Sequence, residues 1–176
     1  CKIAPSVRVS LAEAFGMPIG TFEEGKMVTA LKMLGFKKVF DVNMGADFTV
    51  KEEAEELVER IKQNKNLPQF SSCCPAWFKF VQNHFKAYED SLSTCKSPTE
   101  MLGAIIKNYY TQKYDIPKDK IRTVGIMPCT AKKMEAARPE FVHDGRPDVD
   151  LVLTTREAID MMQETGIQLS ELELES

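Results

Sequence analysis

Short apolar runs alternate along the chain with longer segments in which apolar residues recur at helical spacing. The apolar runs predict strands at residues 3–11, where the strand leads into a helix, and at 38–42, 68–70, 123–127 and 148–153. The helical periods predict helices at residues 24–34, 49–65, 75 onward, 99–114 and 155–165. Because strands and helices alternate, we predict an α/β fold with a mainly parallel sheet flanked by helices.

Local signals mark the ends of several predicted helices. Gly35 follows the first helical period as a C-terminal stop, and Pro75 stands where a helix can begin, since proline is favoured at the first helical position. In the helix predicted at residues 49–65, Thr49 is the candidate N-cap. The apolar stripe of that helix consists of Ala54, Leu57, Val58 and Ile61.

The helix predicted at residues 49–65 also carries a stripe of charged side chains. Glu53, Glu56 and Arg60 are spaced i, i+3 and i+7, so they share one face. The simplest interpretation is a solvated acidic face, which is common on helices of this composition. A partly buried ladder of carboxylates could instead relay protons if it led to an acid beside a metal.

Composition is that of a globular protein. Hydrophobic residues make up 43% and charged residues 28% of the 176 positions, so the chain can form one domain or one lobe of a larger domain. The 23 Lys+Arg and 26 Asp+Glu give a net charge of −3, which argues against a nucleic-acid partner. No apolar run reaches the roughly 20 residues of a membrane helix, and no leader is visible, so we expect a cytoplasmic protein without a membrane partner.

The five cysteines are an odd and sparse set, which suits a reduced protein better than a disulfide framework. Cys73 and Cys74 stand directly before the helix predicted to begin at Pro75, and Cys129 follows the strand predicted at 123–127. Because ligands bind at the carboxyl ends of parallel strands, both segments should lie at the functional edge of the sheet. A helix N-terminus favours the thiolate, which is the form that binds soft metals.

Each cysteine segment taken alone is equally well explained by a buried thiol near a turn. Together they favour a metal site, and Lys132 adds a positive charge that suits an anionic cluster. Two or three thiols do not complete a four-thiolate iron–sulfur site, and no C-x-x-C spacing indicates a self-contained zinc or ferredoxin-type site. His84 and His143 have no partner at ligand spacing, so we interpret them as surface or hydrogen-bonded histidines.

The cysteine segments and three further segments match a known family in the same order. Ser71-Ser72-Cys73-Cys74-Pro75 is similar to a first motif, T-S-C-C-P, with serine in place of threonine. Met127-Pro128-Cys129-Thr130-Ala131-Lys132-Lys133-Met134-Glu135 is similar to a second, M-P-C-x-x-K-x-x-E, and further landmarks lie at 4–8, 45–49 and 96–98. Over its whole length the chain thus resembles the catalytic domain of the [FeFe] hydrogenases. The resemblance implies that residues 1–176 are the N-terminal lobe of this two-lobed iron-only hydrogenase domain.

In that family the domain carries the H-cluster, a [4Fe–4S] cubane joined through a cysteine to a two-iron unit with CO, CN⁻ and a bridging dithiolate. The resemblance implies that Cys74 and Cys129 each ligate the cubane and that Cys73 exchanges a proton with the dithiolate amine. It implies that Ser93, Glu53 and Glu56 continue the proton path outward from Cys73, with Arg60 near its mouth. It also implies that the two-iron unit is lined by Pro5, Ser6, Met127 and Lys132, the last of which would hold a cyanide.

The reaction that the resemblance implies is the reversible conversion of H₂ into two protons and two electrons. The metal would cleave the bond, and the protein would position the cluster, exclude water and deliver protons. Two partners are implied: a second, C-terminal lobe that supplies the other two cubane cysteines, and a ferredoxin-like electron carrier. Nothing after Thr165 resembles the third cysteine motif of that second lobe.

Two alternatives stay open. Relatives that sense H₂ or assemble iron–sulfur proteins share much of this lobe, and Thr99, where active members commonly have Gln, is compatible with such a non-catalytic role. The complete set of Cys73, Ser93 and the two glutamates of the charged stripe argues against it, because a scaffold needs no proton path. The other alternative is an apo α/β lobe that exposes its partner-facing surface and associates or aggregates without the second lobe.

Overall fold

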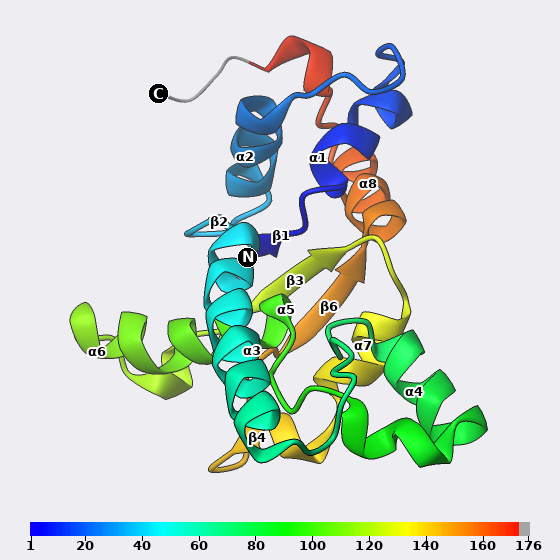
Figure 1. The fold of residues 1–176 in the computed structure, drawn as a ribbon. Coiled ribbons are helices and arrows are strands. Elements are labelled where there is room, and N and C mark those ends of the chain that lie inside the picture. Colours follow the sequence, from blue (N-terminus) through cyan, green and yellow to red (C-terminus); the bar gives the residue numbers. More distant parts are fainter. Residues whose placement is uncertain (173–176) are drawn as a thin grey trace.

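The computed structural model describes residues 1–172, and a parallel sheet lies at its centre. Four strands pair in the order β2-β1-β3-β6 (Figure 1). Every pairing within this sheet is parallel, which confirms the predicted fold class. The strands are β1 (Lys2–Ile3), β2 (Phe40–Asp41), β3 (Val124–Met127) and β6 (Leu151–Thr154).

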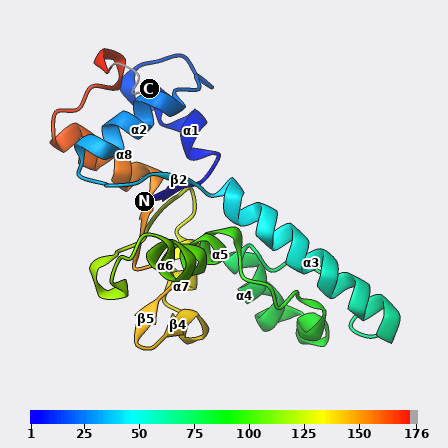
Figure 2. The same cartoon turned by 90° about the vertical axis from the view of Figure 1, so that its left-hand side faces the viewer.

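The helices form two groups around this sheet (Figure 1). One group, at the top of Figure 1, consists of α1 (Val7–Ser10), α2 (Glu24–Met33) and α8 (Thr155–Glu164). The other consists of α3 (Asn43–Gln63), α4 (Pro75–His84), α5 (Pro98–Ile105), α6 (Thr111–Lys113) and α7 (Ala131–Ala136). Figure 2 shows that α3 projects from the sheet region as a long arm, with α4 on the same side of the molecule.

Shorter elements complete the described chain. A π-helical turn at Ile106–Tyr110 joins α5 to α6. The strands β4 (Val142–His143) and β5 (Arg146–Pro147) form an antiparallel hairpin. Turns of 3-10 helix lie at Ala12–Phe15, Lys86–Ser91, Lys118–Lys120, Pro139–Phe141 and Leu169–Glu171. None of the helices within residues 1–172 has the length and apolar character needed to cross a bilayer.

The predicted helix boundaries agree best where a cap or a proline marks them. The helix α4 begins at Pro75 as predicted, and α8 begins at Thr155 after a capping box in which Thr154 and Glu157 bond each other's backbone N–H groups. Strands are shorter than predicted, and residues 68–70 contribute only a parallel bridge between Phe70 and Leu92. The predictions therefore located the four strands of the parallel sheet but overestimated their lengths, and they missed the β4–β5 hairpin.

The helix predicted to begin at Thr49 begins at Asn43, so the prediction that Thr49 is its N-cap is wrong. Thr49 is buried inside α3, and its hydroxyl donates to the carbonyl oxygens of Gly45 at 3.0 Å and Lys96 at 3.2 Å. A Cβ at Gly45 would approach the Pro98 carbonyl oxygen to 2.1 Å, so glycine is what allows α3 to pass so close to α5. The additional length of helix is stabilised by a tertiary contact that no local capping signal encodes.

The hydrophobic core extends from the sheet into α1, α2 and α8 on one side and into α5 on the other. Leu31, Ile126 and Met162 are each 1% exposed at its centre. The predicted apolar stripe of α3 lies outside this core, because Ala54, Leu57, Val58 and Ile61 are all exposed. Leu57, Val58 and Ile61 are 38–58% exposed, so this apolar helix face is available for a partner.

Candidate functional site

The segment with adjacent cysteines lies at the beginning of α4. Cys74 is the N-cap of this helix, and its Sγ accepts a hydrogen bond from the Trp77 backbone N–H at 3.4 Å. Cys73 and Cys74 are both free and exposed. The Cys74 sulfur therefore lies at the positive end of a helix dipole and within reach of solvent, which is a suitable place for a metal-bound thiolate.

The second cysteine segment lies against the first. Cys129 is a half-buried free thiol between the carboxyl end of β3 and the beginning of α7. The Lys132 ammonium donates to the Cys73 carbonyl oxygen at 2.7 Å and to Glu135 Oε2 at 2.7 Å. Segments that are more than fifty residues apart in the sequence are thus joined by a single lysine near the carboxyl end of β3.

Glu135 holds that lysine from within the protein. Its side chain is 2% exposed and accepts hydrogen bonds from Lys132 Nζ and, at 2.9 Å, from the Ser97 hydroxyl. The same Ser97 hydroxyl accepts from the Glu100 backbone N–H and so caps α5. Sequence reasoning identified Glu135 only as the last residue of a motif, and its spacing of three residues from Lys132 was the signal that could have identified an ion pair.

The other residues that the resemblance predicts around a two-iron unit lie near the ends of neighbouring strands. Pro5 and Ser6 are exposed directly after β1, whereas Met127, the last residue of β3, is 2% exposed. The Thr99 hydroxyl, at the position where the family commonly has Gln, lies 3.5 Å from Met127 Sδ. Pro5 and Ser6 are therefore open to a ligand, while Met127 is packed inside the lobe beside Thr99.

Three residues of the predicted proton path form a continuous hydrogen-bonded group, namely Ser93, Glu56 and Arg60. The Ser93 hydroxyl donates to Glu56 Oε2 at 2.6 Å, and Arg60 Nη2 donates to Glu56 Oε1 at 2.7 Å. Burial raises the pKa of the Glu56 carboxyl, but hydrogen bonds from Ser93, Thr94 and Arg60 outweigh it and hold the pKa below its usual 4.5. Glu56 is therefore ionised at neutral pH and accepts a hydrogen bond from the Ser93 hydroxyl.

Arg60 has a structural role that the sequence did not indicate. Its guanidinium is largely buried, with 10% of the side chain exposed. Besides Glu56 it donates to backbone carbonyl oxygens after α3 and around the end of the 3-10 turn at Lys86–Ser91, namely those of Asn66, Asp90, Ser91 and Leu92. One side chain therefore fixes the loop that carries Ser93 against α3.

Glu53 contacts the first cysteine segment through Ser71, the position where the family motif has threonine. The Ser71 hydroxyl donates to Glu53 Oε1 at 2.8 Å, and the Gln69 amide donates to the Glu53 carbonyl oxygen at 3.0 Å. Within residues 1–172, no hydrogen bond joins Glu53 directly to Glu56 or to the Cys73 thiol. The predicted path is therefore assembled in two parts that begin on the same face of α3.

Cys95 lies near this path but differs from the motif cysteines. It is half-buried, and its thiol points to the Thr49 carbonyl oxygen at 3.9 Å. Burial, followed by the nearby carboxylates led by Glu53, raises the pKa of Cys95 to about 11. This thiol stays protonated and does not suit metal binding.

Two buried ionisable side chains on β1 and α5 were not predicted, and both carboxylate oxygens of one of them, Glu100, have no hydrogen-bond partner among residues 1–172. Lys2 and Glu100 are both 0% exposed, and the Lys2 ammonium donates to the Thr99 carbonyl oxygen at 2.7 Å. Burial lowers the pKa of Lys2 to about 8 although Glu100 opposes this, and burial raises the pKa of Glu100 to about 7 although Lys2 opposes it. Burial thus brings the pKa values of both side chains toward the neutral pH range.

The cysteines of this chain fit part of an iron–sulfur site. Among residues 1–172, no group of three or more His, Cys, Asp or Glu side chains is arranged to hold a metal ion. Cys74 and Cys129 supply two thiols on adjacent segments, whereas a cubane requires four ligands. This chain can therefore supply two of the four ligands of such a cluster, and the other two must come from another segment or chain.

Comparison with known proteins identifies relatives over the whole chain. The family model described as "Iron only hydrogenase large subunit, C-terminal domain" matches residues 1–176. "Iron hydrogenase 1" of Clostridium pasteurianum is 45% identical over 171 residues, which are 97% of this chain and 30% of that protein. "Cytosolic iron-sulfur assembly component 3" of Rattus norvegicus is 35% identical over 179 residues, which are 98% of this chain and 37% of that protein.

Solved structures match the fold equally well. The structure described as "Stepwise [FeFe]-hydrogenase H-cluster assembly revealed in the structure of HydA(deltaEFG)" superposes with a TM-score of 0.93 at 39% identity. An apo [FeFe]-hydrogenase HydA1 variant from Chlamydomonas reinhardtii gives a TM-score of 0.92 at 38% identity. Each match covers 98% of this chain, but only 43% and 44% of the respective solved chains. The chain thus spans less than half the length of these relatives.

Proposed function

Because the chain belongs to the iron-only hydrogenase family, we propose that residues 1–176 form the N-terminal lobe of a hydrogenase catalytic domain. The lobe would take part in the reversible conversion of H₂ into protons and electrons. The observation that carries this proposal is the Lys132 ammonium, which bonds the Cys73 carbonyl and so joins both cysteine segments at one edge of the sheet.

The residues at this edge suit an anionic iron cluster. Cys74 and Cys129 would hold the cubane, and Pro5, Ser6 and Met127 would line the two-iron unit together with Lys132. When bound, the cluster supplies the redox chemistry that no side chain has. The chain's own part is positioning: Glu135 orients the Lys132 ammonium, which would donate a hydrogen bond to an anionic ligand of the iron.

Proton delivery is the second task that this chain would perform. Cys73 would exchange a proton at the cluster, and Ser71 ties that segment to Glu53. Farther out, the Ser93 hydroxyl donates to the Glu56 carboxylate, so a proton that arrives at Glu56 can be passed through the serine oxygen. Arg60 keeps Glu56 and the serine loop together at the outer end.

The two missing thiolates require a partner, and the proposed partner is a second lobe. It is supported by the relatives, whose chains are at least twice as long as the matched region. It is also supported by the exposed apolar face of α3, where Val58 is 50% and Ile61 58% exposed. A ferredoxin-like protein would exchange electrons with the completed domain, and we propose that it acts in the cytoplasm.

A non-catalytic iron–sulfur assembly role is the second candidate. The observation that favours it is the 35% identity to "Cytosolic iron-sulfur assembly component 3" over 98% of this chain. The identity to "Iron hydrogenase 1" is higher, at 45%. The hydrogen-bonded Ser93–Glu56–Arg60 group favours catalysis, because an assembly scaffold has no need of a proton path.

Turnover and cluster content must be measured separately to test the proposal. The chain is combined with its second lobe and reconstituted, and H₂ evolution, iron content and EPR spectra are recorded for the wild type and for Cys73→Ser. We expect Cys73→Ser to lose nearly all turnover while its iron content and EPR spectrum stay unchanged. The matched control is Cys1→Ser, which changes a half-buried thiol outside both cysteine motifs and should keep full turnover.

Each other outcome has a definite meaning. Turnover of Cys73→Ser equal to the wild type would reject the relay role of Cys73. Full iron occupancy of the wild-type assembly with no detectable H₂ chemistry would reject the hydrogenase assignment and favour the scaffold. Stoichiometric iron in the chain alone would contradict the need for a second lobe.

A further inference from the structure

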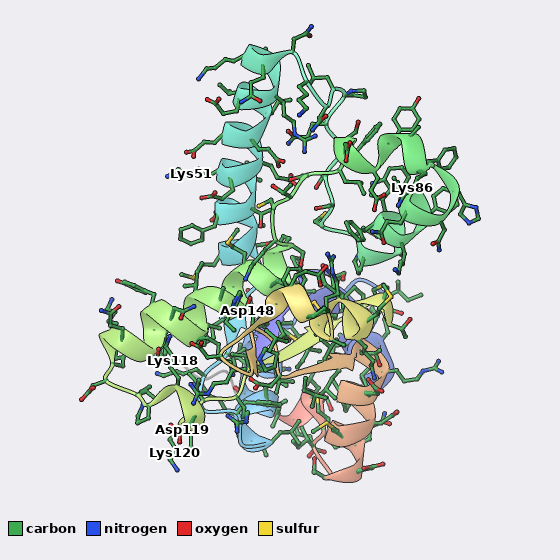
Figure 3. The ribbon with its side chains drawn as sticks, turned by 90° about the horizontal axis from the view of Figure 1, so that it is seen from below. Lys51, Lys86, Lys118, Asp119, Lys120 and Asp148 are labelled. Carbon is green, nitrogen blue, oxygen red and sulfur yellow. The ribbon has the colours of Figure 1, made fainter. Side chains whose placement is uncertain are left out.

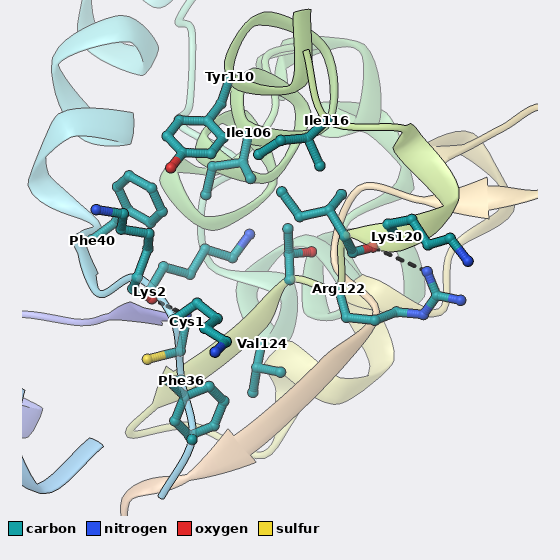
Figure 4. A pocket seen from close by; sticks show the side chains of 15 residues that line it. Cys1, Lys2, Phe36, Phe40, Ile106, Tyr110, Ile116, Lys120, Arg122 and Val124 are labelled. Atoms are coloured by element: carbon teal, nitrogen blue, oxygen red, sulfur yellow. Dashed lines mark hydrogen bonds between the residues drawn. The ribbon is translucent and has the colours of Figure 1, made fainter. Parts of the chain in front are cut away.

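A pocket opens at the amino ends of the strands, at the opposite edge of the sheet from the cysteine segments (Figure 4). Its volume is about 560 Å³, within the range of small-molecule sites. Lys2 at the start of β1 and Val124 at the start of β3 line it, whereas Cys129 follows the other end of β3. The pocket is therefore separate from the proposed cluster site.

The wall of this pocket is apolar. Figure 4 shows Phe36, Phe40, Ile106, Tyr110 and Ile116 around the opening, and the Phe40 and Tyr110 rings meet edge to face with centroids 5.6 Å apart. Ile106 and Tyr110 belong to the π-helical turn between α5 and α6. Such turns are rare and frequently lie at functional sites, so the backbone is distorted where the pocket forms.

The rim of the pocket is basic. Four exposed cationic residues line it, namely Lys37, Lys38, Lys120 and Arg122. No aspartate or glutamate is among the lining residues. Within residues 1–172, the side chains of the three rim lysines make no hydrogen bond or ion pair. These ammonium groups are therefore available to an anion that enters the pocket.

From this combination we propose that the pocket binds a medium-chain carboxylate. The alkyl chain lies along Phe36, Phe40 and Ile116, where each methylene that leaves water strengthens binding about fourfold. The carboxylate stays at the solvated rim near Lys38 and Lys120, so its charge is paired without the cost of burial. A cationic amphiphile of the same length is repelled at the rim, and a neutral one gains nothing there.

Titration of the full 176-residue chain with octanoate, nonanoate and decanoate, each below its micelle concentration, tests the proposal. We expect saturable binding at one site by calorimetry, with affinity that rises about fourfold for each added methylene. Decanol and decyltrimethylammonium should bind about tenfold more weakly than decanoate at low salt. Added salt should reduce this difference in affinity, because it screens the charge interaction at the rim.

Charge-reversal variants locate the site without disturbing the core. Lys38→Glu combined with Lys120→Glu should weaken decanoate binding about tenfold and remove its advantage over decanol. The matched control, Lys51→Glu with Lys86→Glu, makes the same change in net charge at remote side chains that are 72% and 80% exposed (Figure 3), and should bind decanoate as the wild type does.

Three results would overturn the proposal. The first is the absence of saturable binding of decanoate. The second is equal affinity for decanoate and decanol, which would show that the basic rim does not recognise the anion. The third is an equal loss of affinity in the control variant, which would show that only the net charge of the chain matters.

Discussion

Helices α3 and α8 are both amphipathic, yet they bury opposite kinds of side chain. On α8, Ala158 and Met162 are each 1% exposed and pack into the core. On α3, Val58 is 50% and Ile61 58% exposed, while Arg60 is only 8% exposed. An apolar stripe thus shows which face of a helix needs a partner, and it does not show whether that partner lies in the same lobe.

The difference separates two tasks within one chain. The helix α8 completes the core of this lobe. The helix α3 turns its charged face inward, where Glu56 and Arg60 organise the loop of Ser93, and leaves its apolar face to the second lobe that we propose. The comparison predicts that the protein loses stability when buried polar side chains of α3 are replaced, and when buried apolar side chains of α8 are replaced.

The largest effect is expected from Arg60→Met. The substitution keeps most of the apolar stem but leaves Glu56 and several backbone carbonyls without their donor. Because breaking a buried ion pair from one side is costly, we expect a loss of about 3–5 kcal/mol in the free energy of unfolding, measured by urea titration. Arg156→Met on the exposed face of α8 is the matched control and should change it by less than about 0.5 kcal/mol. Similar losses from both would contradict the comparison.

Truncation of apolar side chains tests the same contrast from the other side. Met162→Ala on α8 creates a cavity in the core and should cost about 2–4 kcal/mol of unfolding free energy. Ile61→Ala on α3 removes an exposed side chain, so its unfolding free energy should differ from that of the wild type by no more than about 0.5 kcal/mol. The second lobe, once added, should bind the Ile61→Ala chain more weakly, which calorimetry can measure. A large loss of stability for Ile61→Ala in the chain alone would show that α3 already packs on this lobe.

Glu56→Gln tests the charged face of α3 through its pH dependence. Hydrogen bonds to an ionised group contribute about 1.5 kcal/mol or more, so the variant should be less stable than the wild type by about that amount at pH 7. The folded pKa of Glu56 lies below its unfolded value of 4.5, so the contribution is present above pH 4.5 and is lost as the pH falls through the folded pKa. Urea titrations at several pH values should therefore show the two proteins converging in acid, and a constant gap would refute the assignment.

The smallest effect is expected at the cap of α8. Thr154→Ala removes the side chain that accepts from the Glu157 backbone N–H, and it should cost about 1 kcal/mol of unfolding free energy, measured by urea titration. Thr155→Ala, one position inside the helix, serves as the control and should cost less. An equal effect at both positions would mean that the capping box does not stabilise α8.

Much of the site was predictable because its signals are local. Pro75 predicted the start of α4, and the apolar run at 123–127 placed Cys129 at the carboxyl end of β3. The spacing of Glu56 and Arg60 predicted a shared face, and they are ion-paired at 2.7 Å. What spacing could not indicate was the burial of Arg60, because the carbonyl oxygens that accept from it come from loops as far as residue 92.

The sequence by itself determined the α/β alternation, the start of α4 and the family to which the two cysteine motifs belong. These depend on periodicity, caps and residue order, which act over a few neighbouring positions. Only the tertiary structure decided that Lys132 joins the cysteine segments, that α3 buries its charged face, and that an apolar pocket with a basic rim opens at the far edge of the sheet. Each of these depends on contacts between residues far apart in the chain, whose energies no local pattern records.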